Sequence, residues 1–324
     1  MRRLLSGRLR LPVIAAPMTR VSGPDLVLEC CRNGVVGAFP THNASTPTEL
    51  DRWLTHFDNV LAEHPRAAPY AANLIVHRSN RRRDADVDCL LDHGVELVIL
   101  SVGSPQDVIG RLKKGGARVL VDVASLRHVE RARDAGADGV VLLTAGAGGQ
   151  TGWLNPLAFV RAARAIYGGL IVLAGGMTDG HGIAAARVLG ADLAYLGTRF
   201  IATHESLADD DYISALIAAS IDDVFTTTRL TGLPANVLRQ WAQRHLGEDA
   251  HRPAAGFDHG SLGRPGAVWA AGHSAGAVAG RERVADLIER VASEYHAAAS
   301  MNLLGESGGL GLHAFAPAHR SGGA

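Results

Sequence analysis

Two glycine-containing turns in the second half of the chain have the residue types of a phosphate-binding site. Gly175-Gly176 follows the apolar run Leu170–Ala174, and Gly197-Thr198 follows the apolar run Leu193–Leu196. Glycine lets a ligand approach the backbone closely, so that free N–H groups can point at an anion. The two turns would form one cup if the two runs are neighbouring parallel strands. The predicted phosphate-binding residues are Gly175, Gly176, Met177, Gly197 and Thr198.

A second glycine-rich loop, Thr144–Gly152, carries the large polar side chain of Gln150. Its glycines would let the backbone come close to a flat ligand. A carboxamide can orient a substrate oxygen or bond the edge of a ring system, but it cannot be a general base near neutral pH. The alternative interpretation is that Gln150 only stabilises its own loop. We predict Gln150 as a catalytic-site residue and Gly149 as a ligand-binding one.

Histidines supply the candidates for acid–base chemistry. His42 and His77 follow the second and third predicted strands, and both could therefore lie at the same edge of a sheet. A lone histidine in such a loop is more often an ordinary surface residue. If the reaction needs a proton donor or acceptor, His42 and His77 are the best candidates in the sequence.

Other strand ends carry residues that could contact a ring system. Ala16-Pro17-Met18 ends the first apolar run and could cover one face of a ring, although plain core packing is the alternative. Polar residues stand at the ends of the third, fourth and fifth runs, where barrel enzymes carry their sites. The further predicted ligand-binding residues are Ala16, Pro17, Met18, Asn73, Ser101 and Asp122.

The elements that must position these residues alternate regularly along the chain. Continuous apolar runs separated by amphipathic helices indicate a parallel sheet that is buried on both faces. The predicted strands are Val13–Ala16, Val35–Phe39, Tyr70–Ile75, Leu97–Ser101, Arg118–Val123, Gly139–Leu143, Leu170–Ala174 and Leu193–Leu196. Eight strands favour a closed (β/α)8 TIM barrel over an open doubly wound sheet, and no G-x-G-x-x-G follows the first strand.

The barrel pattern ends near residue 206. We expect a barrel core over residues 1–206, a small and mostly helical extension over 207–298 that packs over the barrel mouth, and a disordered tail over 299–324. Within the extension, helices are predicted at Asp209–Ser220, Asn236–Leu246 and Glu282–Ala298. Gly272–Gly276 matches G-x-S-x-G, but it lacks the surroundings of a nucleophile elbow and is expected to be a loop over the barrel mouth.

Composition narrows the possible partners. Lys plus Arg and Asp plus Glu each number 32, so the formal net charge is zero and a nucleic-acid partner is not expected. No apolar run approaches the roughly 18 residues of a membrane helix. Cys30, Cys31 and Cys89 are interpreted as buried thiols of a cytoplasmic protein, and no metal site is expected. The apolar region after the barrel offers a surface for a homodimer.

Taken together, several motifs resemble the nitronate monooxygenase (2-nitropropane dioxygenase-like) family of FMN-dependent TIM barrels, which is itself similar to the FMN-type enoyl-ACP reductases. The resemblance covers roughly Leu11–Tyr295. The motifs are PVIAAPM at Pro12–Met18, NLIVH from Asn73, the segment Gly139–Gly152, LAGGMTDGHG at Leu173–Gly182, LGTRFIATHES at Leu196–Ser206 and WAAGHSAG at Trp269–Gly276. The resemblance implies FMN, with its phosphate on the two glycine turns and its ring near Ala16-Pro17-Met18, Asn73 and Gln150.

The chain departs from this family where the catalytic base is expected. The family usually has AGGH in the loop after the sixth strand, and its His is the base, whereas Gln150 stands here. A Glu often found four residues earlier is Gly146, and a Lys seen in some members near the end of the fifth strand is Asp122. Loss of the base should impair deprotonation of neutral nitroalkanes. It need not prevent oxidation of a nitronate, which is already an anion.

Three functions are therefore open. The leading hypothesis is an FMN-dependent oxidoreductase that oxidises nitronates or related small anions with O2. The second is an NAD(P)H-dependent flavin reductase or enoyl reductase. The third is a non-catalytic barrel that binds FMN or another phosphate.

Overall fold

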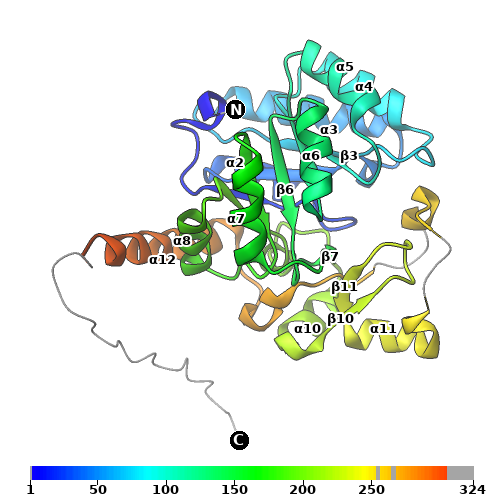
Figure 1. The fold of residues 1–324 in the computed structure, drawn as a ribbon, viewed down its shortest axis with the longest axis vertical. Helices are drawn as coiled ribbons and strands as arrows, with labels where there is room; N and C mark the ends of the chain where they lie inside the picture. Colours follow the sequence, from blue (N-terminus) through cyan, green and yellow to red (C-terminus); the bar gives the residue numbers. More distant parts are fainter. Residues whose placement is uncertain (1, 253–255, 264–267, 305–324) are drawn as a thin grey trace, which may run out of the picture.

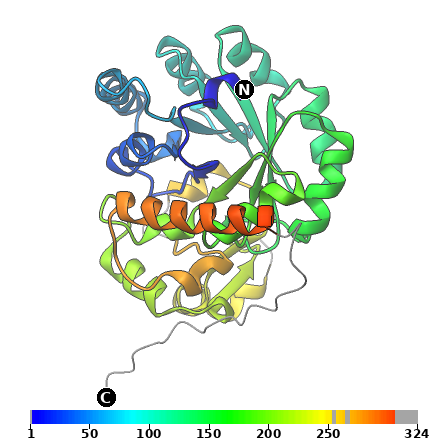
Figure 2. The ribbon, with the colours of Figure 1, turned by 90° about the vertical axis from the view of Figure 1, so that its left-hand side faces the viewer.

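The chain folds into a closed barrel of eight parallel strands, as the sequence predicts (Figures 1 and 2). The structure is a computed structural model, and it describes residues 2–252, 256–263 and 268–304. The barrel strands are β1 (Val13–Ala15), β2 (Val36–Pro40), β3 (Ala71–Ile75), β4 (Leu97–Ser101), β5 (Arg118–Val123), β6 (Gly139–Leu143), β8 (Leu170–Ala174) and β9 (Leu193–Leu196). No end differs by more than one residue from the prediction. β1 pairs with both β2 and β9, and this closes the barrel.

Helices connect the strands on the outside of the barrel. They are α2 (Pro24–Arg32), α3 (Pro47–Ala62), α4 (Arg83–Asp92), α5 (Gln106–Lys114), α6 (Leu126–Asp134), α7 (Pro156–Ile166) and α8 (Gly180–Leu189). Several begin at a side-chain cap: Thr46, Ser125 and Asp179 each accept a hydrogen bond from a backbone N–H of the first turn. These caps fix where the loops after the strands end and the helices begin.

The apolar residues of each strand divide between two layers. One set, which includes Ile14, Ile99 and Val141, fills the barrel interior. The alternate residues, such as Val98 and Leu100, pack against the surrounding helices. This arrangement explains why the strands read as continuous apolar runs, since both faces of the sheet are buried.

The segment after the barrel contains helices and a small sheet at one end of the barrel (Figure 1). Its elements include α9 (Thr198–Ile201), α10 (Asp210–Ala218), β10 (Val224–Thr227), β11 (Ala235–Leu238) and α11 (Arg239–His245). β11 pairs antiparallel with β10 on one side and with the short β7 (Gly149–Gln150) on the other. The helix predicted over Asn236–Leu246 is thus wrong for Asn236–Leu238. This tertiary pairing on both edges overrides the local helical pattern.

The last described element, α12 (Val284–Leu304), packs along α8 (Figure 2). A Cβ atom at Gly180 would lie 2.1 Å from the backbone nitrogen of Tyr295, so only glycine allows this approach. The helix continues past its predicted end at Ala298, into the segment for which disorder was expected. Residues 305–324 of the predicted tail lie outside the described residues. In the described part of the chain, no helix has the length and apolarity to cross a membrane.

Candidate functional site

A cavity of about 490 Å³ lies where the carboxyl ends of the strands meet the extension. This volume is within the usual range for a small-molecule site. Most of the predicted site residues line it: Ala16, Pro17, Met18, His42, Asn73, Ser101, Asp122, Gly149, Gln150, Gly175, Gly176, Met177, Gly197 and Thr198. The barrel topology brings them together, since all the parallel strands end on the same side.

His77 is the predicted site residue that does not line the cavity. Its Nδ1 lies 2.8 Å from the hydroxyl of Ser79, within its own turn. Its ring packs edge-on against Phe257, and Phe257 is the residue that faces the cavity. The structure therefore places His77 behind the cavity wall, at a position from which it supports Phe257.

The turn after β8 requires glycine. Gly175 has a φ of +123°, and a Cβ there would lie 2.3 Å from Oγ1 of Thr144. Gly176 has a φ of +67°, and no described atom lies within 4 Å of the Cβ position. The turn thus packs tightly on its Thr144 side and is open at Gly176. Its exposed backbone can accept an anionic group there.

The turn after β9 forms the other side of the same cup. A Cβ at Gly197 would lie 3.4 Å from Cβ of Ala16 and 3.5 Å from the sulfur of Met18, so the turn rests on the end of the first strand. The Thr198 hydroxyl oxygen accepts a hydrogen bond of 2.9 Å from the N–H of Gly272. Its own hydrogen is left to donate to an anion.

Polar side chains form the floor of the cavity. The Asn73 amide nitrogen donates to the carbonyl of Ile99 at 3.2 Å and to the hydroxyl of Ser101 at 3.1 Å. By contrast, Oδ1 of Asp122 and the hydroxyl of Tyr195 are buried and have no hydrogen-bond partner among the described residues. Unpaired buried polar atoms are costly, so this pair suits a polar ligand edge that would complete their bonds.

Burial also changes the ionisation of these floor residues. It raises the pKa of Asp122 from 3.8 to about 7. Burial, followed by the nearby Asp122 carboxyl, raises the pKa of Tyr195 well above its usual value. Near neutral pH, Tyr195 therefore keeps its hydroxyl proton and can donate it in a hydrogen bond. Asp122 is protonated in about half of the molecules.

The loop that carries Gln150 is fixed by contacts from the extension. The Asn236 amide donates to the carbonyl of Ala147 at 2.7 Å. A Cβ at Gly146 would lie 2.7 Å from Nδ1 of His273, and one at Gly148 would lie 2.7 Å from the backbone nitrogen of Gly272. A Glu side chain could not occupy position 146 without displacing His273. Glycine at positions 146 and 148 therefore lets the loop after β6 pack closely against Gly272 and His273.

Gln150 itself extends from β7 at the cavity wall. The bonds that hold its loop come from other side chains, namely Thr144, Thr151 and Asn236. This disfavours the alternative in which Gln150 serves only to stabilise the loop. A carboxamide at this place in the cavity lining can both donate and accept hydrogen bonds.

His42 lies in the cavity wall, but its surroundings suppress its charge. Its Nε2 lies 3.0 Å from the hydroxyl of Thr19. Burial, and then the nearby His259 and Arg82, lower the pKa of His42 from 6.5 to about 3. The ring is therefore neutral near pH 7, where it can hydrogen-bond a ligand but is a poor acid and a weak base.

Several cavity residues are absent from the sequence predictions. Tyr195 is one for which a signal existed, because it is a polar group within an apolar strand, as Asn73 is. Arg20 and Val102 have positive φ angles of 60° and 48°, a conformation that sequence does not reveal. Others come from the extension, whose docking on the barrel no local pattern predicts, among them Tyr212, Leu230, Trp241, His245, Val268, Ala270 and Ser274.

Comparisons of sequence place these features in context. Residues 58–276 match the family model described as nitronate monooxygenase. The chain is 30% identical to a nitronate monooxygenase of Paraburkholderia phytofirmans, over 75% of this chain and 77% of that protein. It is also 31% identical to a (3aS,4S,5R,7aS)-5-hydroxy-7a-methyl-1-oxo-octahydro-1H-indene-4-carboxyl-CoA dehydrogenase of Mycobacterium tuberculosis. That match covers 70% of this chain and 63% of the dehydrogenase, so it spans less than two thirds of the relative's length.

Two solved structures are similar to this chain over most of its length. FabK from Thermotoga maritima superposes with a TM-score of 0.80 at 26% identity, over 94% of this chain and 98% of its own. A nitroalkane oxidase from Streptomyces ansochromogenes superposes with a TM-score of 0.81, also at 26% identity, over 92% of this chain and 99% of its own.

Proposed function

The chain belongs to the nitronate monooxygenase family of flavin-dependent oxidoreductases, and from this premise we propose that it oxidises substrates that arrive as anions, such as nitronates, with FMN as cofactor and O2 as electron acceptor. One observation carries the proposal: among the residues of the loop after β6 that line the cavity, Gln150 has the polar side chain. A carboxamide cannot remove a proton from carbon near neutral pH. A substrate that needs no deprotonation therefore suits the side of the cavity that Gln150 lines.

The cavity residues fit FMN. Its phosphate would bind the cup of Gly175, Gly176, Gly197 and Thr198, where the turn is open at Gly176 and the Thr198 hydroxyl, which accepts from Gly272, could donate to the anion. The polar edge of its ring would meet the unpaired groups of Asp122 and Tyr195. When bound, FMN supplies the electron acceptor that O2 afterwards reoxidises.

The protein's own contribution is to position the substrate and to control protons. Gln150 can hold an oxygen of the anion by its N–H groups, and neutral His42 can provide a second hydrogen bond. Residues of the extension, among them Tyr212 and Trp241, also line the cavity. Where they shield the reacting atoms from water, each of these hydrogen bonds is strengthened.

A second candidate function is a flavin-dependent reductase or dehydrogenase that acts on an acyl thioester and uses a nicotinamide cofactor. It is supported by the similarity to the M. tuberculosis protein, which is named a CoA dehydrogenase, and by the similarity to FabK. In this case Gln150 would hydrogen-bond the substrate carbonyl instead of a nitronate oxygen. A non-catalytic FMN-binding barrel is the third function, and it predicts bound flavin that no donor reduces.

Anaerobic reduction of the FMN-loaded protein separates these functions. The flavin absorbance is followed after mixing with a nitronate, with NADH or with NADPH. Bleaching by the nitronate alone is the expected result. Bleaching by NADH or NADPH but not by the nitronate would establish the second function. A protein that stays colourless after incubation with FMN would contradict the cofactor assignment.

A further inference from the structure

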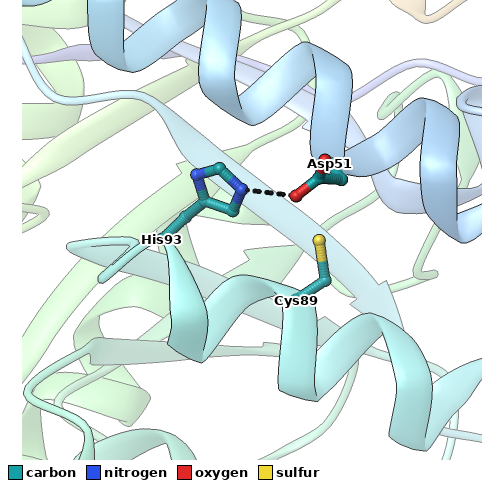
Figure 3. Close-up of side chains that lie close together, drawn as sticks. All are labelled: Asp51, Cys89 and His93. Carbon is teal, nitrogen blue, oxygen red and sulfur yellow. Dashed lines mark hydrogen bonds and ion pairs between the residues drawn. The ribbon is translucent and has the colours of Figure 1, made fainter.

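A separate group of side chains lies outside the barrel, between α3 and α4. Asp51 belongs to α3, Cys89 to α4, and His93 follows the last residue of α4. Their oxygen, sulfur and nitrogen atoms all lie within 4.8 Å of one another. Figure 3 shows the three side chains pointing toward one another across the space between the helices. None of them lines the cavity described above.

The chain spacing explains why these residues meet. Cys89 and His93 are four residues apart, one turn of helix, so they share a face. The same face of α4 packs against α3, which presents Asp51 and, two turns later, Asp58. Residues from two packed helices thus supply a thiol, an imidazole and two carboxylates at one place.

The histidine is already oriented as metal-binding histidines are. Its Nε2 lies 3.0 Å from Oδ1 of Asp51, on the side of Cys89, and its Nδ1 lies 2.8 Å from Oδ2 of Asp58. The other Asp58 oxygen accepts a hydrogen bond of 3.0 Å from the hydroxyl of Tyr70. A carboxylate behind one ring nitrogen is the usual partner of a histidine whose other nitrogen binds a metal.

We propose that Asp51, Cys89 and His93 bind a zinc ion that links α3 to α4, with Asp58 and Tyr70 positioning His93. Sulfur, nitrogen and carboxylate oxygen are the ligands that zinc prefers, and a water would complete four-fold coordination. Ligands of a tetrahedral zinc lie about 3.3–3.7 Å apart, so small side-chain rotations suffice from the present arrangement. When zinc binds, the Cys89 sulfur forms a bond to the metal and its proton goes to solvent.

The surroundings of Cys89 are acidic. The carboxylates of Asp51, Asp86 and Asp92 lie near its sulfur, and negative charge at one place favours a bound cation. The ion pairs of His93 alone would be worth little at this partly exposed position, and they give no role to Cys89.

The test is a titration of the purified FMN-loaded protein with Zn²⁺ alone, followed by calorimetry, and with Co²⁺, followed by absorption difference spectra. We expect one zinc ion per chain, a melting temperature that rises with zinc concentration, and a thiolate-to-cobalt charge-transfer band. Cys89→Ser and His93→Gln should abolish the band and weaken zinc binding at least about tenfold. Asp58→Asn should weaken zinc binding by about 10–100-fold, because it removes only the support behind His93.

Matched controls come from the same two helices. His56→Gln removes an exposed histidine of α3, and Asp88→Asn removes an acid of α4 that pairs with Arg111, so both should bind zinc as the parent does. Each variant is checked by its metal-free melting temperature, which should equal that of the parent. Absence of zinc binding at micromolar concentrations, or equal binding by parent and Cys89→Ser, would overturn the proposal.

Discussion

The two ends of the central cavity are built in different ways. At one end, the turns after β8 and β9 offer backbone, and Gly175 and Gly176 of the first turn have positive φ angles that other residues rarely adopt. At the other end, the loop after β6 presents a single side chain, Gln150, on a short strand held by the extension. Loss of one backbone glycine should destroy ligand binding at the first end. Change of one side chain at the second should alter the reaction and leave binding intact.

The largest expected effect follows from Gly175→Ala. The new Cβ would lie 2.3 Å from Oγ1 of Thr144, and the backbone would remain at a φ of +123° that alanine rarely adopts. We expect the variant to lose its FMN during purification, measured as the ratio of flavin to protein absorbance. Gly168→Ala is the control, because nothing lies within 4 Å of its Cβ position. Full FMN content in Gly175→Ala would show that the turn after β8 does not bind the FMN phosphate.

At the opposite end, Gln150→His should restore a base. General-base catalysis is worth about 10²–10⁴-fold, so we expect oxidation of a neutral nitroalkane to rise by about 10²-fold or more. Oxidation of the nitronate should change much less. Initial rates of O2 consumption with each substrate provide the measurement. An unchanged ratio between the two substrates would mean that position 150 does not face the carbon that loses the proton. Gln150→Asn serves as the control that adds no base.

Between these ends, Asp122→Asn should change how the stability of the flavin-free protein depends on pH. The pKa of Asp122 is raised to about 7, so between pH 4 and 7 the folded state keeps a proton that the unfolded state releases. Ionisation of Asp122 therefore lowers the free energy of unfolding as pH rises through that window. Asn does not ionise, so the variant does not show this decrease. As pH rises from 5 to 8, the free energy of unfolding of the variant should increase by about 2–4 kcal/mol relative to that of the parent, as measured by denaturant unfolding. Parallel pH profiles for both proteins would exclude the raised pKa.

His42→Gln should show the opposite sign and a smaller effect. The pKa of His42 is lowered to about 3, so below pH 6.5 the unfolded state takes up a proton that the folded state refuses. Stability from this group is lost as pH falls from 6.5 toward 3. As pH falls from 7 to 5, the free energy of unfolding of the variant should decrease by about 1–2 kcal/mol less than that of the parent. The exposed His64→Gln should follow the parent; a variant profile identical to that of the parent would contradict the assignment.

The sequence predicts the barrel well because its signals are local. Each strand is an apolar run bounded by polar or glycine residues, so the predicted and observed strand ends agree to within one residue. The helices between the strands are marked by apolar residues that recur at the helical period. The same logic brings the predicted cavity residues to one side of the sheet. His77 follows a strand as His42 does, but a bond to Ser79 turns it away from the cavity, and no pattern encodes that rotamer.

Features that depend on distant pairings were missed. β11 reads as part of a helix because its edge partners, β7 and β10, lie in other parts of the chain. Cys89 was interpreted as a buried thiol, yet it is partly exposed and meets Asp51 only after α3 and α4 have packed together. The extension residues that line the cavity have the same origin, since tertiary packing alone places them there.

The most direct test of the central claim is a stopped-flow comparison of one nitronate with its freshly dissolved neutral nitroalkane, under anaerobic conditions, with the FMN-loaded protein. We expect rapid flavin reduction by the nitronate and reduction at least about 10²-fold slower by the neutral compound, because Gln150 stands where the family's base is expected and a carboxamide cannot accept the proton. Equal rates with both compounds would show that the site deprotonates carbon, and this would contradict the role assigned to Gln150.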